Sequence, residues 1–394
     1  ASSTRRDHRR FRIAAVAESA AEMREGLAFL AREARSNGGA GVVRARVQPL
    51  RVAFCFSGHG SQWAGMARGL LPREPVFREA VVEIDHALQS LGAQISIHEC
   101  LTDPDQVQSL KDVYVAQLAI FAVQIGLARL WQAWGLQPEV TIGHSLGEAA
   151  AAFTAGALTL DDATSVVFHR SRLMKEGLAR LLAQGRSGGA MATAAISLRE
   201  ARELLLGIEH EVSVAACNAP SSVVLSGNAA VLADLVEKLR ARGVSCREID
   251  VPDSGHNPLV EEILPELQQA LGHLQPRASE IPFVSTVTAG ILDGTQLGAA
   301  YWCRNVRETV LWESSVRELL KQGLNGFLEL SPHPLVLPSV LECAGGDADV
   351  VALPSLRRKC SERRELLSSV AALYREGLDF DWIRIVGAPR GFVQ

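Results

Sequence analysis

Residues 139–156 read EVTIGHSLGEAAAAFTAG, a short β-branched segment followed by a glycine-rich turn and then by an alanine-rich run. The pattern predicts a strand over residues 140–142, a tight turn over 143–147 and a helix after it. Gly-x-Ser-x-Gly between a strand and a helix is typical of a nucleophile elbow, which exposes the serine hydroxyl at the helix N-terminus. Ser145 is therefore the candidate nucleophile, and the backbone N–H of Leu146 is a candidate donor to a developing oxyanion. The alternative is an ordinary glycine turn that carries a surface serine.

The composition limits the class of protein. The chain has 394 residues, of which 47% are hydrophobic and 21% charged, with a formal net charge of −4. Such a chain can form two or three globular domains, and its charge balance argues against nucleic acid as the main partner. The seven cysteines are scattered without CxxC spacing, which indicates reduced thiols and no metal site. We expect no membrane span and no secretory signal, and therefore a cytoplasmic protein without a membrane partner.

Strand and helix patterns alternate along most of the chain, which predicts the α/β fold class. Residues 52–56 predict a buried strand, followed by the glycine-containing loop 57–62 and a helix from about Trp63. Within residues 187–251 the predicted order is strand, helix, two strands, helix and strand, as in a ferredoxin-like unit. We predict an α/β-hydrolase-like large subdomain into which this unit is inserted, preceded by an N-terminal α/β subdomain. Residues 379–394 are expected to be irregular.

A serine hydroxyl needs a base to act as a nucleophile at neutral pH. Of the ten histidines, His256 lies on a Gly- and Pro-containing loop well after the elbow, where the chain order of hydrolase triads places the base. A surface loop histidine is the alternative. Asp161, Asp162 and Asp234 lie between the two in sequence, but none is favoured as a triad acid, so a Ser–His dyad is the simpler interpretation.

Six stretches together resemble the acyltransferase domain of type I polyketide synthases, a relative of malonyl-CoA:acyl-carrier-protein transacylases. They are FCFSGHGSQW at 54–63, IGHSLGE at 142–148, FHRSRLM at 168–174, ACNAPSSVVLSG at 216–227, GHNP at 255–258 and FLELSPHPLV at 327–336. The chain does not begin with methionine, which suggests a domain excised from a larger protein. The resemblance divides the chain into a ketosynthase-to-acyltransferase linker (1–50), a large subdomain (51–186 and 252–345), an inserted small subdomain (187–251) and a post-acyltransferase linker (346–394).

The resemblance also implies residue roles. Ser145 would carry the acyl group, His256 would be the base oriented by backbone carbonyls, and the N–H groups of His59 and Leu146 would form the oxyanion hole. Arg170 would bind the free carboxylate of a malonyl-type group, although an arginine on a solvated helix face is the alternative. The implied reaction is ping-pong transfer from acyl-CoA to the phosphopantetheine thiol of an acyl carrier protein, without a bound cofactor or metal. The adjacent ketosynthase would be a further partner, and the excised domain is expected to be a monomer.

The sequence departs from the family pattern at two positions, of which the second concerns specificity. The usual GQGSQ loop is GHGSQ here, with His59, and similar loops occur in iterative aromatic synthases. Before the histidine, malonyl-selective members resemble His-Ala-Phe and methylmalonyl-selective members Tyr-Ala-Ser, whereas this chain has Asp253, Ser254 and Gly255. Less bulk at this wall predicts an α-substituted malonyl group, ethyl or larger. Gln117 is a further pocket candidate.

Three other functions stay open from the sequence. A serine hydrolase or thioesterase of the α/β-hydrolase type would need an acid and a pocket open to water, and Arg170 would be incidental in it. A malonyl-only acyltransferase of an iterative synthase would need another wall to restore selectivity. A non-catalytic scaffold is disfavoured because Ser145 and His256 are both present.

Overall fold

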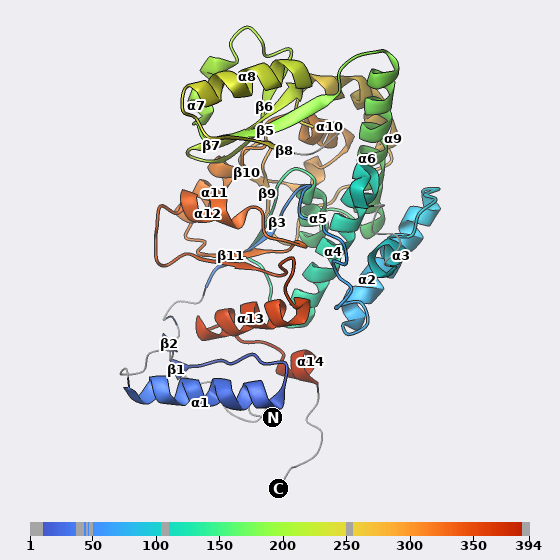
Figure 1. Cartoon of the computed structure of the whole chain (residues 1–394). Helices are drawn as coiled ribbons and strands as arrows, with labels where there is room; N and C mark the ends of the chain where they lie inside the picture. Colours follow the sequence, from blue (N-terminus) through green and yellow to red (C-terminus); the bar gives the residue numbers. More distant parts are fainter. Residues whose placement is uncertain are drawn as a thin grey trace.

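The computed structural model describes residues 11–36, 43–44, 46, 50–103, 110–249 and 255–387. Asp253 and Ser254 lie outside the described residues. The described strands form one six-stranded sheet, one four-stranded sheet and one two-stranded ribbon (Figure 1).

The six-stranded sheet has the order β10-β9-β4-β3-β11-β12, and all neighbouring pairs are parallel except the edge strand β10. Successive side chains of the central strand β3 enter two different cores, one with Phe54 and Phe56 and the other with Ala53 and Cys55. Burial of both faces is what a parallel sheet requires, and it confirms the predicted α/β class. The strands are β3 (Val52–Phe56), β4 (Val140–Gly143), β9 (Phe283–Ser285), β10 (Gly290–Leu292), β11 (Gly326–Glu329) and β12 (Val351–Pro354).

Helices cover both faces of this sheet. On the Phe54 side lie α2 (Pro75–Ser90), α4 (Val113–Ala133), α5 (Gly147–Thr154) and α6 (Leu160–Ala183), with α3 (Ile97–Thr102) beside α2. On the opposite side lie α11 (Trp312–Lys321) and α12 (Leu337–Cys343). The helix predicted from Trp63 is wrong, because turns occupy residues 64–73 and α2 begins at Pro75.

Helix α4 is long and apolar enough to cross a membrane by length and composition, a feature that was not predicted from the sequence. In the fold, 89% of its most apolar window is buried inside the protein, where it packs against α2, α5 and α6. Its hydrophobicity is therefore accounted for by its place in the core.

The four-stranded sheet lies at the other end of the molecule from α1 and is antiparallel, with the order β6-β7-β5-β8 (Figure 1). Two helices pack on it around a separate core. This arrangement confirms the predicted ferredoxin-like unit. Its elements are β5 (Gly189–Ala194), α7 (Leu198–Leu204), β6 (Val212–Ala219), β7 (Ser222–Asn228), α8 (Ala229–Ala241) and β8 (Cys246–Ile249). Paired backbone hydrogen bonds of Val310 with Ala215 and Cys217 join it to the large subdomain.

The segment after β8 returns to the large subdomain. It contains η2 (Pro258–Ile263) and α9 (Leu264–Ala270), and after β10 follow η3 (Gly294–Gln296) and α10 (Ala299–Arg307). The sequence pattern predicts no helix at α10. This omission matters because the C-terminal end of α10 lies against His256.

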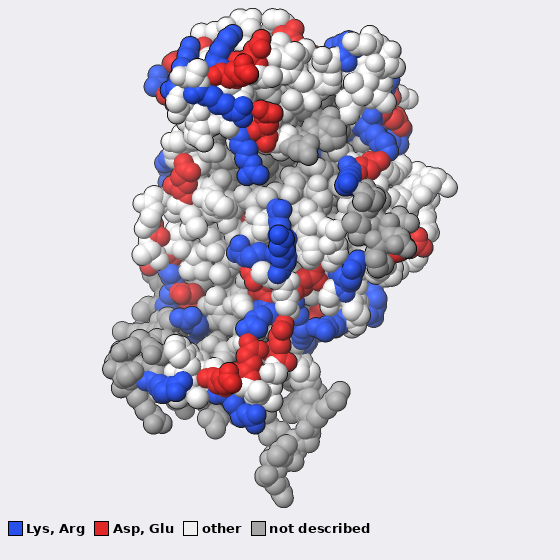
Figure 2. All heavy atoms as spheres, in the orientation of Figure 1, with Lys and Arg blue, Asp and Glu red and all other residues white. Residues whose placement is uncertain are grey.

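The two ends of the described chain pack together beyond the large sheet (Figure 1). β1 (Phe11–Arg12), α1 (Ala20–Ser36) and β2 (Val43–Arg44) lie near α13 (Glu362–Arg375) and α14 (Trp382–Val386). Arg12 donates hydrogen bonds to the carbonyls of Tyr374 and Leu378. α14 shows that the expected irregular tail is helical over five residues. Figure 2 shows basic and acidic side chains interspersed over the viewed face.

Candidate active site

The turn between β4 and α5 has the geometry of a nucleophile elbow. A Cβ atom added at Gly143 would lie 2.2 Å from the backbone N of Glu148, and one at Gly147 would lie 2.1 Å from the carbonyl O of Phe56. No side chain fits at either position. Ser145 has a φ of 54°, in the left-handed region that non-glycine residues rarely adopt. Backbone strain of this kind is typical of functional sites, and here it turns the serine hydroxyl into a cavity.

Ser145 and His256 are in direct contact although 111 residues separate them. Ser145 Oγ lies 2.7 Å from His256 Nε2, and His256 Nδ1 lies 2.7 Å from the carbonyl O of Glu308. A carbonyl only accepts hydrogen bonds, so Nδ1 carries the hydrogen and Nε2 offers its lone pair to the serine. The backbone N of His256 donates to the carbonyl of Val306, and its φ is 61°. The histidine is thus held at both its ring and its backbone.

The surroundings keep His256 neutral. Its side chain is buried, and burial together with the positive charge of Arg170 lowers its pKa to about 3. The hydrogen bond to the Glu308 carbonyl opposes this shift without overcoming it. The imidazole can therefore accept a proton from Ser145 throughout the neutral pH range.

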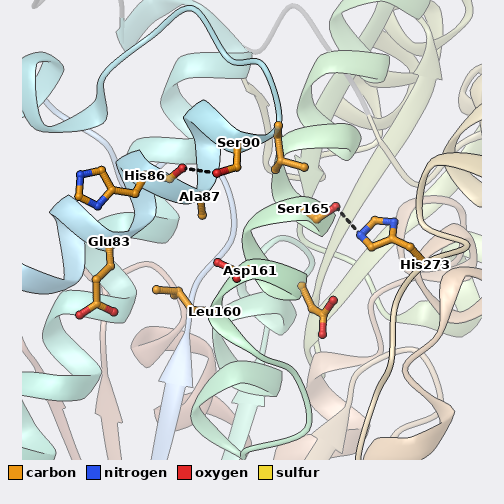
Figure 3. A pocket seen from close by; sticks show the side chains of 10 residues that line it. Glu83, His86, Ala87, Ser90, Leu160, Asp161, Ser165 and His273 are labelled. Carbon is orange, nitrogen blue, oxygen red and sulfur yellow. Dashed lines mark hydrogen bonds between the residues drawn. The ribbon is translucent and has the colours of Figure 1, made fainter.

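No acid completes a triad among the described residues. Asp161 and Asp162 line a different cavity, of 460 Å³, between α2 and the start of α6 (Figure 3). His273 lines that cavity as well and contacts Ser165 at 3.2 Å. Asp234 belongs to α8 of the small subdomain. The ring nitrogens of His256 are instead occupied by the serine hydroxyl and a backbone carbonyl.

Arg170 lines the cavity into which the Ser145 hydroxyl points, and it does not lie on a solvated helix face. Its residue is 5% exposed, and its Nη1 donates to Gln117 Oε1 at 2.5 Å. Its Nη2 lies 3.2 Å from Ser145 Oγ. Gln117 therefore contacts the arginine in addition to lining the cavity. A guanidinium one hydrogen bond away from the serine can bind an anionic group of an acyl chain attached there.

The loop after β3 packs against the elbow. A Cβ atom at Gly58 would lie 3.0 Å from the carbonyl O of His144, and Gln124 donates to the carbonyl of Ser57 at 2.7 Å. His59 lines the cavity, and burial lowers its pKa to about 4, so its ring is neutral. Leu146 is 2% exposed and packs its side chain in the core, which leaves only its backbone available to the site.

The cavity measures 640 Å³ and lies between the two subdomains. The small subdomain supplies part of its wall, namely Met191, Thr193, Asn218, Val224, Arg247, Glu248 and Ile249. His144 Nε2 lies 2.8 Å from Asn218 Oδ1, which ties the elbow to that wall. Gly255 is buried at the cavity, and a Cβ atom there would lie 3.5 Å from Met174 Cε. Among the described residues no group of three or more His, Cys, Asp or Glu could hold a metal ion.

A buried carboxyl next to the elbow was not predicted from the sequence. Glu148 is fully buried, and its Oε1 lies 2.5 Å from the backbone N and 2.7 Å from Oγ1 of Thr286. Its Oε2 lies 2.6 Å from the Tyr301 hydroxyl and 2.8 Å from Asn305 Nδ2. Burial raises the pKa of Glu148. Its position directly after the elbow motif was the available signal, whereas nothing in the sequence marks Asn305 on α10.

Comparison with known proteins gives one consistent result. A family model described as acyl transferase domain matches residues 53–378. Erythronolide synthase EryA2 of Saccharopolyspora erythraea is 37% identical over 383 residues, which cover 96% of this chain and 10% of that protein. This chain thus spans about a tenth of the length of that curated relative.

Two solved structures share the fold over most of the chain. The acyltransferase domain from module 8 of the salinomycin polyketide synthase superposes with a TM-score of 0.82 at 36% identity, covering 92% of this chain and 84% of that one. A loading acyltransferase from the avermectin modular polyketide synthase gives a TM-score of 0.75 at 37% identity, covering 82% of this chain and 99% of that one.

Proposed function

Because this chain belongs to the acyl transferase domain family and is an acyltransferase, we propose that it transfers an extender acyl group from coenzyme A to the phosphopantetheine thiol of an acyl carrier protein. The acyl group would be carried as an ester on Ser145, in polyketide biosynthesis. The observation that carries this proposal is the contact of Ser145 with both His256 and Arg170.

The first half-reaction follows from the dyad geometry. Ser145 Oγ attacks the thioester carbonyl carbon, and His256 Nε2 takes the hydroxyl proton as the O–C bond forms. The C–S bond then breaks, and the proton on Nε2 passes to the departing CoA sulfur. The backbone N–H groups of His59 and Leu146 are the proposed donors to the carbonyl oxygen, which becomes negatively charged during the attack.

The second half-reaction repeats these steps with another thiol. His256 takes the proton of the phosphopantetheine thiol, whose sulfur attacks the ester carbonyl, and the proton returns to Ser145 Oγ as the C–O bond breaks. His256 needs no acid partner for this, since the Glu308 carbonyl already fixes its tautomer. The donor acyl-CoA and the carrier protein bring their own pantetheine arms, so the domain itself requires no bound cofactor.

Arg170 supports a dicarboxylic acyl group. Its buried guanidinium lies beside the serine that would carry the acyl carbonyl. In a malonyl-type group a single α-carbon separates that carbonyl from the free carboxylate. A planar guanidinium can bind this carboxylate through two parallel hydrogen bonds. A monocarboxylic acyl group has no second carboxylate and cannot form these two hydrogen bonds.

Gly255 supports an α-substituted malonyl group. It lies directly before the base, lines the cavity, and carries no side chain where it faces Met174 and the carbonyl of Val306. Met191, Val224 and Ile249 add apolar side chains to the lining of the same cavity, which suits an alkyl substituent. The proposed acyl group is therefore ethylmalonyl or larger.

The domain assignment extends the proposal to the parent protein. We assign 1–50 and 346–394 to linkers, 51–186 and 252–345 to the large subdomain, and 187–251 to the small subdomain. The proposed partners are an acyl carrier protein and the adjacent ketosynthase of a cytoplasmic synthase. We expect the excised domain to be a monomer.

Competition loading tests the acyl group. Wild-type protein is mixed with equal concentrations of malonyl-, methylmalonyl-, ethylmalonyl- and butylmalonyl-CoA, and intact-protein mass spectrometry reports the adducts. The proposal expects ethylmalonyl and butylmalonyl adducts that the Ser145→Ala variant lacks. A malonyl adduct alone would reject the substituted group and favour a malonyl-only acyltransferase.

A further inference from the structure

Met174 lies one helical turn after Arg170 on α6, so both side chains face the catalytic cavity from the same side of the helix. Ser145 and Arg170 would fix two of the groups on the α-carbon of a bound malonyl unit, its thioester-derived carbonyl and its carboxylate. A third group on that carbon must point toward the remaining wall. Met174 and Gly255 adjoin each other in the lining of the cavity, since a Cβ atom at Gly255 would touch Met174 Cε at 3.5 Å, and we assign them to that wall.

A second, smaller cavity lies on the other side of Met174. Its volume is 20 Å³, somewhat more than the roughly 10–15 Å³ that one water-sized sphere needs. It is lined by Met174, Gly177, Gly189 and five branched aliphatic residues, namely Leu178, Leu181, Leu259, Val260 and Ile263. The side chains that line this cavity are apolar, and it has room for about one methyl group.

Met174 is the described residue that lines both cavities. It is 4% exposed, and its unbranched thioether side chain has three rotatable bonds and adapts easily to its surroundings. We propose that Met174 is an adjustable wall of the acyl pocket, whose terminal methyl group moves into the small void when an α-alkyl substituent presses against it. This proposal rests on the proposed function, and it makes Met174 the residue that sets which acyl groups the cavity accepts.

This arrangement explains how one pocket can take acyl groups of different size. With a malonyl group the methyl group of Met174 stays beside Gly255 and fills the space that the missing substituent leaves. With an alkylmalonyl group the methyl group withdraws into the small cavity, and the substituent occupies the vacated volume. Tolerance therefore depends on a void that no substrate atom enters.

Filling the small cavity with a larger side chain is the decisive test. Leu181 lines it but does not line the catalytic cavity, so Leu181→Phe would block the void without touching the catalytic residues. The adjacent Leu182 is 56% exposed, which makes Leu182→Phe the matched control. Met174→Leu is a second variant, because leucine has a similar volume but a stiffer, branched side chain. The readout is the ratio of butylmalonyl to malonyl adduct on Ser145 in competition loading.

We expect Leu181→Phe and Met174→Leu to lower this ratio about tenfold, as a misfit of a methylene or two does, while malonyl loading of Leu181→Phe and the Leu182→Phe ratio stay at the wild-type level. Thermal unfolding checks that each variant is folded, and Met174→Leu decides the matter if Leu181→Phe is not. An unchanged ratio in the folded variants overturns the adjustable wall but leaves substituted-malonyl transfer standing. Wild-type loading of malonyl alone overturns the adjustable wall but not acyl transfer, whereas absence of any Ser145 adduct rejects the proposed function itself.

Discussion

The amide of Asn305 lies between the Glu148 carboxyl, at 2.8 Å, and the backbone carbonyl of Ser145, at 3.2 Å. Asn305 belongs to α10, and the two carbonyls that hold His256 come from Val306 and Glu308 at the end of the same helix. Glu148 thus connects the segment that carries Ser145 with the segment that holds His256. We expect the positioning of Ser145 and His256 to depend on this buried carboxyl, which does not itself contact either side chain.

Replacing Glu148 by glutamine should therefore impair acylation. Both carboxyl oxygens face obligatory donors, the Thr286 backbone N–H on one side and the Asn305 amide on the other. An amide NH₂ group must face one of them, and a displacement of 1 Å at the dyad can cost about 100-fold in rate. We expect kcat/KM for acylation to fall between about 10- and 100-fold, mainly through kcat, with about 1–3 kcal/mol of stability lost.

Glu362→Gln is the control for this prediction. Glu362 is also a buried carboxyl that accepts backbone hydrogen bonds, from Ala67 and Gly69, but it lines neither the catalytic cavity nor the elbow. The Glu362→Gln variant should be less stable than wild type but should keep the wild-type acylation rate per folded molecule. Equal rates for Glu148→Gln and wild type would refute the positioning role.

The Arg170→Gln variant should distinguish dicarboxylic from monocarboxylic acyl groups. Loss of two charge-assisted hydrogen bonds to a carboxylate should slow malonyl loading about 100- to 1,000-fold relative to propionyl loading. The ratio of the two rates is the measurement, because Arg170 also contacts Ser145 Oγ and its loss affects both substrates. Arg172→Gln serves as control, since Arg172 pairs with Glu176 on the same helix. An equal fall in the malonyl and propionyl loading rates would refute the role of Arg170 in binding the carboxylate.

Acid should destabilise the fold through His256. Its folded pKa of about 3 lies below the ordinary value of 6.5, so the unfolded state takes up a proton first as the pH falls. The stability contributed by neutral His256 is complete above pH 6.5 and is lost toward pH 3, by about 2 kcal/mol at pH 5. The free energy of unfolding is measured with urea at pH 7.5 and pH 5. Between these pH values it should fall by about 2 kcal/mol less in His256→Gln than in wild type. Parallel pH dependences of the two proteins would contradict the assignment.

The sequence predicted the parts of this site that depend on local backbone chemistry. The elbow follows from Gly143 and Gly147, whose absence of side chains is required by contacts within a few residues and with β3. The pairing of Ser145 with His256 was predicted from the chain order of hydrolase triads, although His256 follows β8 of the antiparallel four-stranded sheet and not a strand of the large parallel sheet. The ferredoxin-like order was equally readable from alternating strand and helix patterns.

Other parts of the site cannot be recognised from the types of residue in the sequence. The groups that hold His256 are backbone carbonyls, which every residue possesses, so neither Val306 nor Glu308 could be singled out from the sequence. The nine-residue helix α10 has only two and a half turns, too few for a clear apolar period. The void behind Met174 arises from the packing of α6 against η2, which only the folded chain brings together.

Transfer from Ser145 to a thiol tests the central claim most directly. Wild-type protein is loaded with ethylmalonyl-CoA, freed of excess CoA, and divided between buffer and buffer with pantetheine, with Ser145→Ala treated in parallel. We predict a mass gain of one ethylmalonyl group on wild type alone, stable for many minutes in buffer and discharged to acyl-pantetheine when the thiol is added. Rapid loss to free ethylmalonate in buffer, whether or not pantetheine is present, would contradict acyl transfer and identify a hydrolase.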